Sequence, residues 1–222
     1  MNTITEIRAL MFSDYLIPPG APKFYEEIED IKVLQQTIEN KIADINMVSE
    51  KPVDLVMFNF AIEHIVTIGR ILKQPAGNAL LIGVGGSGRK SLTRLACEIS
   101  EHEIYQIQLT KTYGINDWRE DMRQLTTQCG GRGKTTTFLL DDTQIKEDSF
   151  LEDVNGLLNS GEIPNLFDNE QKAELLELVR KLSKNRGKSI ESLKKLYNFF
   201  IENCSTDLHC VICASPIGDA FR

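Results

Sequence analysis

A glycine-rich turn between an apolar run and a helical pattern is the feature that most limits how this chain can fold. The apolar run ends at Ile82, residues 83–91 read Gly-Val-Gly-Gly-Ser-Gly-Arg-Lys-Ser, and helical spacing of apolar residues begins directly afterwards. A strand, a tight loop and a helix in this order direct several backbone N–H groups and the positive end of the helix at one anion. The sequence therefore predicts a phosphate-binding loop, with an ordinary strand-to-helix turn as the alternative.

The turn follows the P-loop pattern G-x-x-x-x-G-K-[ST] with two departures. Gly83 and Gly88 hold the two glycine positions, but Arg89 stands at the lysine position and Lys90 at the Ser/Thr position. Arg89 can still bind phosphate oxygens through its guanidinium fork, whereas Lys90 lacks the hydroxyl that ligates Mg²⁺. A loop shifted by one residue would give Lys90 and Ser91 the usual roles and would misplace Gly88. The expected nucleotide-binding residues are Gly83, Val84, Gly85, Gly86, Ser87, Gly88, Arg89, Lys90 and Ser91.

Apolar runs alternate with helical patterns along most of the chain, which predicts a parallel sheet with right-handed crossovers. We expect strands at 79–82, 104–109, 136–140 and 209–214. We expect helices at 90–99, 117–128, 149–158, 172–182 and 190–203, the second of them stopped by Gly130 and Gly131. Before the sheet, helical patterns cover 4–12, 30–45 and 53–72, with Asp54 placed to cap the last of these.

Two acids and a serine follow predicted strands. Asp141 and Asp142 end the run Phe-Leu-Leu-Asp-Asp, and Ser215 follows the last apolar run. In an open α/β sheet the carboxyl ends of the strands face the ligand crevice, so Asp141 is expected at the metal position and Asp142 at the catalytic-acid position. Asp142 stands where a glutamate is usual, and its carboxylate therefore falls about 1.5 Å short. The alternative for all three residues is a turn that ends a strand.

Charge and cysteine content narrow the functional classes. The net charge of −7 argues against a nucleic-acid-binding face, and no apolar stretch is long enough to span a membrane. The five cysteines are odd in number, and Cys210 and Cys213 lie within a run that reads as a buried strand. A strand directs these two side chains to opposite faces, so we interpret the cysteines as reduced core thiols of a cytosolic protein.

The chain resembles the fourth AAA+ module of axonemal dynein heavy chains over nearly its whole length. The resemblance is carried by residues 83–89 and 91–95, by Tyr113-Gly114 with Trp118, by 142–147 and 149–153, by 157–159 with 161–167, and by 215–222; residues 10–15 resemble the segment that leads into this module. It implies a P-loop AAA+ large subdomain, an α/β fold with helices flanking a parallel sheet. We expect an N-terminal segment with helices at 1–52 and an incomplete AAA+ core at 53–222.

The resemblance also implies a function. Dynein heavy chains are microtubule motors with a ring of six AAA+ modules, of which the later nucleotide-binding ones are largely regulatory. It implies that ATP or ADP is the ligand, with Mg²⁺ as a possible cofactor. It also implies that Ser215 occupies the sensor position. The implied partners are neighbouring AAA+ modules and, through the full-length protein, microtubules and dynein light and intermediate chains. The implied location is the cytoplasm and cytoskeleton, in the axoneme of a cilium or flagellum.

Three functional hypotheses remain open at this stage. The module is regulatory, or it is a hydrolysis-competent ATPase, or it is a structural piece with a vestigial pocket. Because the family's sheet has five strands and a helical lid follows it, we expect this chain to be truncated before both, which would leave the loop-bearing strand as an exposed edge.

Overall fold

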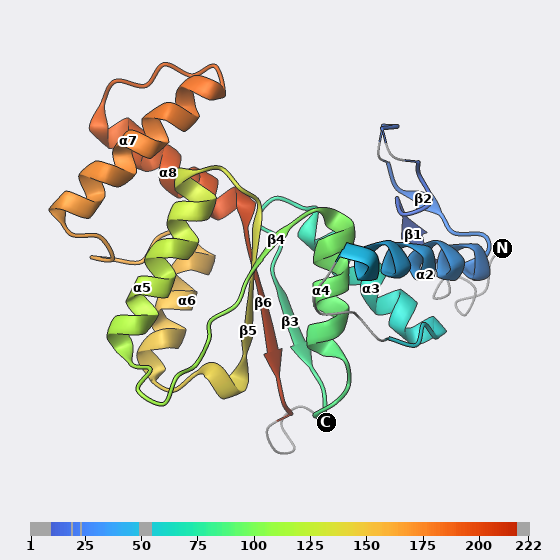
Figure 1. Ribbon diagram of the computed structural model, residues 1–222. Helices are drawn as coiled ribbons and strands as arrows, with labels where there is room; N and C mark the ends of the chain where they lie inside the picture. Colours follow the sequence, from blue (N-terminus) through green and yellow to red (C-terminus); the bar gives the residue numbers. More distant parts are fainter. Residues whose placement is uncertain (1–9, 19, 23, 49–54, 217–222) are drawn as a thin grey trace.

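A parallel four-stranded sheet runs through the middle of the chain, with helices on both faces (Figure 1). The computed structural model describes residues 10–18, 20–22, 24–48 and 55–216. The strands are β3 (Ala79–Ile82), β4 (Glu103–Tyr105), β5 (Thr136–Asp141) and β6 (Leu208–Ala214), in the spatial order β3-β6-β5-β4. All three pairings are parallel, which confirms the α/β fold expected from the sequence.

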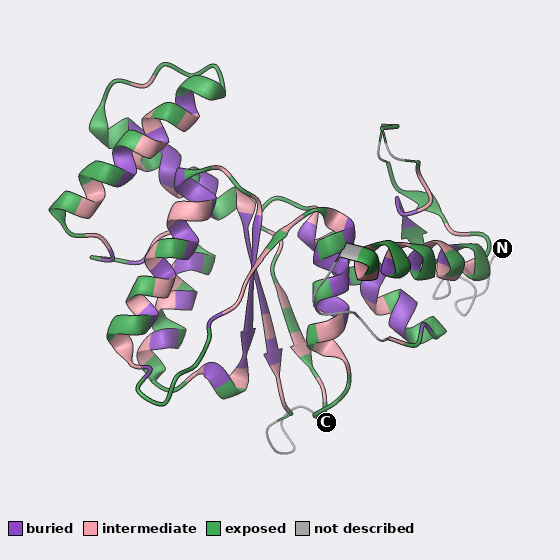
Figure 2. Cartoon of the chain, in the orientation of Figure 1, coloured by how far each residue is buried: buried purple, intermediate pink, exposed green. Residues whose placement is uncertain are grey.

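The central strands are buried on both faces because helices cover each side of the sheet (Figure 2). Leu139 and Val211 belong to the core on the side of α2, α3 and α4, whereas Phe138 and Leu140 belong to the core that contains α5 and α6. Such two-sided burial explains why these strands read as nearly continuous apolar runs. Cys210 and Cys213 fall in opposite cores, and all five cysteines are free and buried, as expected.

On the first face lie α2 (Ile31–Val48), α3 (Asn59–Leu72) and α4 (Arg89–Ser100). The helix expected at 53–72 begins only at Asn59, and Asp54 lies outside the described residues. Val56 and Phe60 are 80% and 60% exposed, whereas the buried residues of α3 begin at Ala61. Met57 precedes the helix yet is buried in the same core as α3, so burial alone does not decide where the helix begins.

The segment ahead of α2 differs from the helical pattern expected at 4–12. Residues 4–9 lie outside the described part, and Phe12 belongs to β1 (Phe12–Ser13), which pairs antiparallel with β2 (Glu26–Glu27). The division of the chain at 52/53 stays a prediction; α2 contributes Leu34, Ile38 and Ile42 to the same core as α3 and α4.

On the second face lie α5 (Ile115–Thr126) and α6 (Asp148–Ser160), whereas α7 (Asn169–Asn185) and α8 (Leu193–Asp207) form a separate core with each other. The glycine pair that was expected to stop the helix at 117–128 lies inside a π-helical turn, η1 (Thr127–Gly131), that continues α5. Gly130 is buried against α8, where an added Cβ would lie 2.4 Å from Cys204 Sγ. The absence of a side chain therefore serves close packing here rather than helix termination.

The strand expected at 104–109 is shorter than predicted. β4 ends at Tyr105, and the carbonyl of Ile107 accepts a hydrogen bond from Gln144 Nε2 at 2.9 Å instead of a strand partner. The chain leaves the sheet at this point, where a side chain and not a neighbouring strand donates the hydrogen bond to the backbone carbonyl.

The strand before the glycine loop lies at the edge of the sheet. Among the described residues, β3 pairs only with β6, and Leu80 and Ile82 are 59% and 41% exposed. This agrees with the exposed apolar edge expected from the resemblance. Within the described residues, no helix is long and apolar enough to cross a membrane.

Candidate functional site

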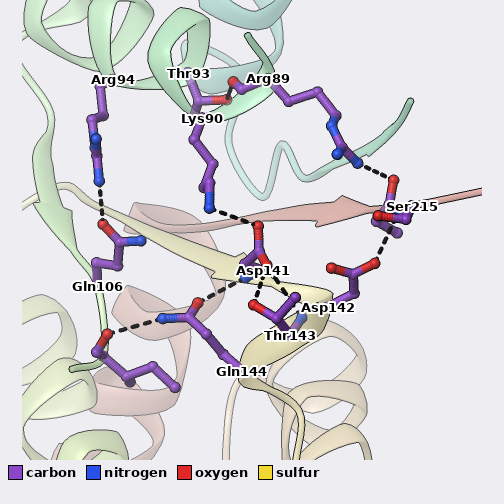
Figure 3. A network of polar contacts seen from close by, with 12 residues as sticks. Arg89, Lys90, Thr93, Arg94, Gln106, Asp141, Asp142, Thr143, Gln144 and Ser215 are labelled. Atoms are coloured by element: carbon purple, nitrogen blue, oxygen red, sulfur yellow. Dashed lines mark hydrogen bonds and ion pairs between the residues drawn. The ribbon is translucent and has the colours of Figure 1, made fainter. Parts of the chain in front are cut away.

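Three parallel strands bring the predicted site residues to one edge of the sheet (Figure 3). β3 leads into the loop at 83–88, β5 ends at Asp141, and β6 ends just before Ser215. Because β6 lies between β3 and β5, its end separates the loop from the two acids. The carboxyl edge of a parallel sheet is where such folds bind ligands.

The loop takes a backbone path that requires glycine at two positions. Gly86 and Gly88 both have φ of +80°, a region that residues with a Cβ enter only at a cost. The N–H of Ser87 donates to the carbonyl of Val84 at 3.2 Å, and the N–H of Leu92 donates to the carbonyl of Gly88 at 2.8 Å. The loop therefore turns tightly and passes directly into α4, whose first residue is Arg89.

Arg89 lies across the loop toward the end of β6. Its guanidinium donates to the backbone carbonyl of Ala214 through Nη1 and to that of Val84 through Nη2, the latter at 3.3 Å. The same Ala214 carbonyl accepts the N–H of Gly83 at 3.1 Å. The cation thus stands over the glycine loop, with a backbone carbonyl partner in the loop and another at the end of β6.

Lys90 points in a different direction, toward the acid at the end of β5. Its Nζ lies 3.0 Å from Oδ2 of Asp141, and the side chains are 47% and 10% exposed. The other oxygen of Asp141, Oδ1, accepts hydrogen bonds from the backbone N–H and the hydroxyl of Thr143. Burial by itself raises the pKa of Asp141, but the hydrogen bonds from Thr143 and Lys90 outweigh it and hold this pKa below its ordinary value.

Asp142 and Ser215 are in direct contact. The backbone N–H of Ser215 donates to Asp142 Oδ2 at 2.6 Å, so the second acid is tied to the end of β6. Both residues are partly exposed. Ser91 follows Lys90 in the first turn of α4 and is not part of the network drawn in Figure 3.

Sequence reasoning missed the residues that hold Asp141 in place. Asp141 caps the short 3₁₀ turn η2 (Asp142–Gln144), and the backbone N–H of Asp141 donates to Gln144 Oε1 at 2.8 Å. An acid followed three residues later by glutamine is the sequence signature of a capping box, and this signal could have identified Thr143 and Gln144 as supporting residues.

The chemistry available at this edge is the recognition of an anion. Two fixed cations, Arg89 and Lys90, adjoin a loop that exposes Gly85, Gly86 and Ser87 to solvent. Within the described part of the chain, no three His, Cys, Asp or Glu side chains are grouped so as to hold a metal ion. A cavity of about 450 Å³ between α5 and α7, lined in part by Tyr105, Arg123 and Gln171, includes none of the predicted site residues.

The family described as "P-loop containing dynein motor region D4" matches residues 53–222 of this chain. Relatives match more of it. Mouse "Dynein axonemal heavy chain 3" is 46% identical over 221 residues, which are 99% of this chain and 5% of that protein. Human "Dynein axonemal heavy chain 1" is 40% identical over 222 residues, again 5% of its length. The "Dynein-1-beta heavy chain, flagellar inner arm I1 complex" of Chlamydomonas reinhardtii is 44% identical over 199 residues, or 89% of this chain and 4% of that protein.

Proposed function

The chain belongs to the dynein heavy chain family, as part of its P-loop motor region, and from this premise we propose that it binds ATP or ADP and acts as a regulatory module of an axonemal motor. The observation that carries the proposal is the convergence of a glycine loop and two cations at the carboxyl edge of the sheet. Backbone N–H groups and the start of α4 provide the remaining attraction for a polyphosphate.

We assign the phosphates to residues 83–91, with Arg89 as the principal cation. Its guanidinium already stands over the loop, where a phosphate oxygen can replace the carbonyl of Val84 as hydrogen-bond acceptor. A guanidinium offers two parallel donors to a phosphate, which suits it to the lysine position of the P-loop pattern. The register with Arg89 at that position is supported by the direction of Lys90, which reaches the metal-position acid Asp141 instead of the loop.

Slow hydrolysis follows from the second acid. Asp142 is one methylene shorter than glutamate, and its Oδ2 is engaged by the N–H of Ser215. The shorter side chain and its hydrogen bond to the end of β6 both keep the carboxylate back from the position that a glutamate would reach. A displacement of about 1 Å can lower a rate about a hundredfold. Asp142 and Ser215 would therefore report the state of the bound nucleotide to β6 more effectively than they would promote its cleavage.

The regulatory role is a linkage between nucleotide state and the arrangement of the motor. A nucleotide can shift a conformational equilibrium only if it binds the two conformations with different affinity. The partners in this proposal are the neighbouring AAA+ modules of the same heavy chain and, through the full-length protein, microtubules and dynein light and intermediate chains. The location is the axoneme of a cilium or flagellum, within the cytoskeleton and cytoplasm.

The test is the binding of fluorescent N-methylanthraniloyl-labelled ATP and ADP to the wild-type chain, to Arg89→Ala and to Arg94→Ala. Arg94 lies on the same helix and donates to Gln106 Oε1 at 2.7 Å, which makes it a matched control away from the loop. Loss of one charge-assisted contact of about 1.5–3 kcal/mol should weaken binding about tenfold to a hundredfold in Arg89→Ala. Arg94→Ala should bind as the wild type does.

Turnover separates the two remaining alternatives. ATP hydrolysis that requires Mg²⁺ and is abolished by Asp142→Asn would make the module a competent ATPase and would refute the regulatory proposal. Failure of both labelled nucleotides to bind would favour a vestigial pocket with a structural role.

A further inference from the structure

Lys90 occupies the position at which a P-loop presents a hydroxyl to Mg²⁺. The ammonium group is 3.0 Å from Asp141 Oδ2 and so lies at the acid that would hold the metal. The Lys90 side chain is 47% exposed, whereas the Asp141 side chain that it reaches is 10% exposed. This chain thus carries the positive charge of a lysine side chain at the position where a P-loop binds Mg²⁺.

The residues around Asp141 do not fit a divalent cation. Oδ2 is paired with Lys90, and Oδ1 is held by the backbone N–H and hydroxyl of Thr143. Mg²⁺ requires near-octahedral coordination by oxygen ligands and is bound through one or two carboxylates, retained waters and substrate phosphates, so the space beside the carboxylate must admit the hydrated cation. Position 90 supplies an ammonium group, which repels a cation and donates where a ligand must accept.

We propose that the Lys90 ammonium permanently replaces the divalent cation at Asp141, so that this module binds a nucleoside di- or triphosphate without Mg²⁺. The inference rests on the proposed function, since it assumes that the loop takes a nucleotide. An ammonium group carries three donors, and the contact with Asp141 uses one of them. The others remain for phosphate oxygens, while Asp141 keeps the ammonium in place.

Mg²⁺ dependence of nucleotide affinity tests this proposal on the 222-residue chain. Dissociation constants for N-methylanthraniloyl-ADP are measured in excess Mg²⁺ and in excess EDTA. The two wild-type dissociation constants should agree within about twofold. Such a difference corresponds to much less free energy than one charge-assisted contact contributes. Lys90→Ser restores the hydroxyl and removes the charge. Its affinity in EDTA should fall by about tenfold or more, and Mg²⁺ should restore it.

Lys134→Gln is the matched control. Lys134 also pairs with a carboxylate, that of Glu103 at 2.6 Å, but at the opposite, amino end of the strands. Removal of this pair should leave the Mg²⁺ dependence at the wild-type value. A second variant, Lys90→Gln, removes the charge without adding a hydroxyl, so its affinity should fall in EDTA and stay low in Mg²⁺.

Each outcome decides between the two proposals. Wild-type binding that weakens about tenfold in EDTA overturns the Lys90 inference and leaves nucleotide binding intact. A Lys90→Ser chain that binds in EDTA as tightly as the wild type also overturns it. The wild-type comparison needs no variant to fold. Absence of binding in both media overturns the proposed function together with the inference.

Discussion

Replacement of Gly130 by alanine tests how the π-helical turn is packed against α8. A Cβ at this position would lie 2.4 Å from Cys204 Sγ and 2.6 Å from Phe200 Cδ2, far below the 3.4 Å at which ordinary contact begins. Both obstacles are 1% exposed and belong to the core between α7 and α8. Neither can turn aside into solvent, so the added methyl group must displace α8 or the turn itself.

The magnitude follows from two opposing terms. Overpacking of a filled core costs about 1–3 kcal/mol. Alanine also lowers the conformational entropy of the unfolded chain relative to glycine, which stabilises the folded state by about 0.4–1 kcal/mol. Taken from the middle of these two ranges, Gly130→Ala should lower the free energy of unfolding by about 1–2 kcal/mol, and the Tm of a chain of this size by about 2–8 °C.

The assay is thermal and urea unfolding followed by circular dichroism, with Gly131→Ala as control. A Cβ at Gly131 would meet Leu175 Cδ1 at 3.1 Å, a contact that the end of a flexible side chain can relieve. Gly131→Ala should therefore unfold within about 0.5 kcal/mol of the wild type. In a Cys204→Ala background the cost of Gly130→Ala should shrink, because the sulfur is gone. A Gly130→Ala chain as stable as Gly131→Ala would refute the reasoning.

Three further predictions concern protonation and the core. Burial is the main reason that the pKa of His102 is lowered to about 4 and that the pKa of His209 is lowered as well. Below pH 6.5 the unfolded chain therefore binds more protons at these histidines than the folded chain does. Urea unfolding should show stability falling as pH drops from 6.5 toward 4, and less steeply in His102→Gln; equal slopes would contradict this. The pKa of Asp141 is held below 3.8, so the stability it contributes is present above that pH and lost as pH falls further. The difference in unfolding free energy between wild type and Asp141→Asn should therefore shrink only below that pH, and a difference constant down to pH 2 would count against the pairing. Trp118 is fully buried and stacks on Phe150 at 4.3 Å, so Trp118→Ala should cost about 3–5 kcal/mol in urea unfolding; a loss below about 1 kcal/mol would exclude its role as a packing anchor.

Prediction from the sequence succeeded where a local pattern coincides with tertiary burial. The strand at 79–82 was predicted correctly, although it lies at the edge of the sheet, because its four residues are all apolar. The acids were expected at the end of a strand because β5 is buried on both faces and therefore mostly apolar, and because parallel strands present their carboxyl ends at one edge. It failed where packing overrode the pattern. The apolar pattern extends ahead of Asn59, where the helix begins, and Met57 is buried in the core without being helical. The glycine pair lies inside a π-helical turn because α8 approaches it closely.

From the sequence alone it followed that a glycine loop joins a strand to a helix and that Asp141, Asp142 and Ser215 lie at the ends of strands. Both are consequences of short-range geometry and of chain order. The partner of each charged side chain, by contrast, depends on how the elements pack. Arg89 and Lys90 are adjacent in the chain, yet one contacts the carbonyl of Ala214 and the other contacts the carboxylate of Asp141. Successive residues of a helix point about 100° apart, so the placement of β5 and β6 beside α4 assigns their partners.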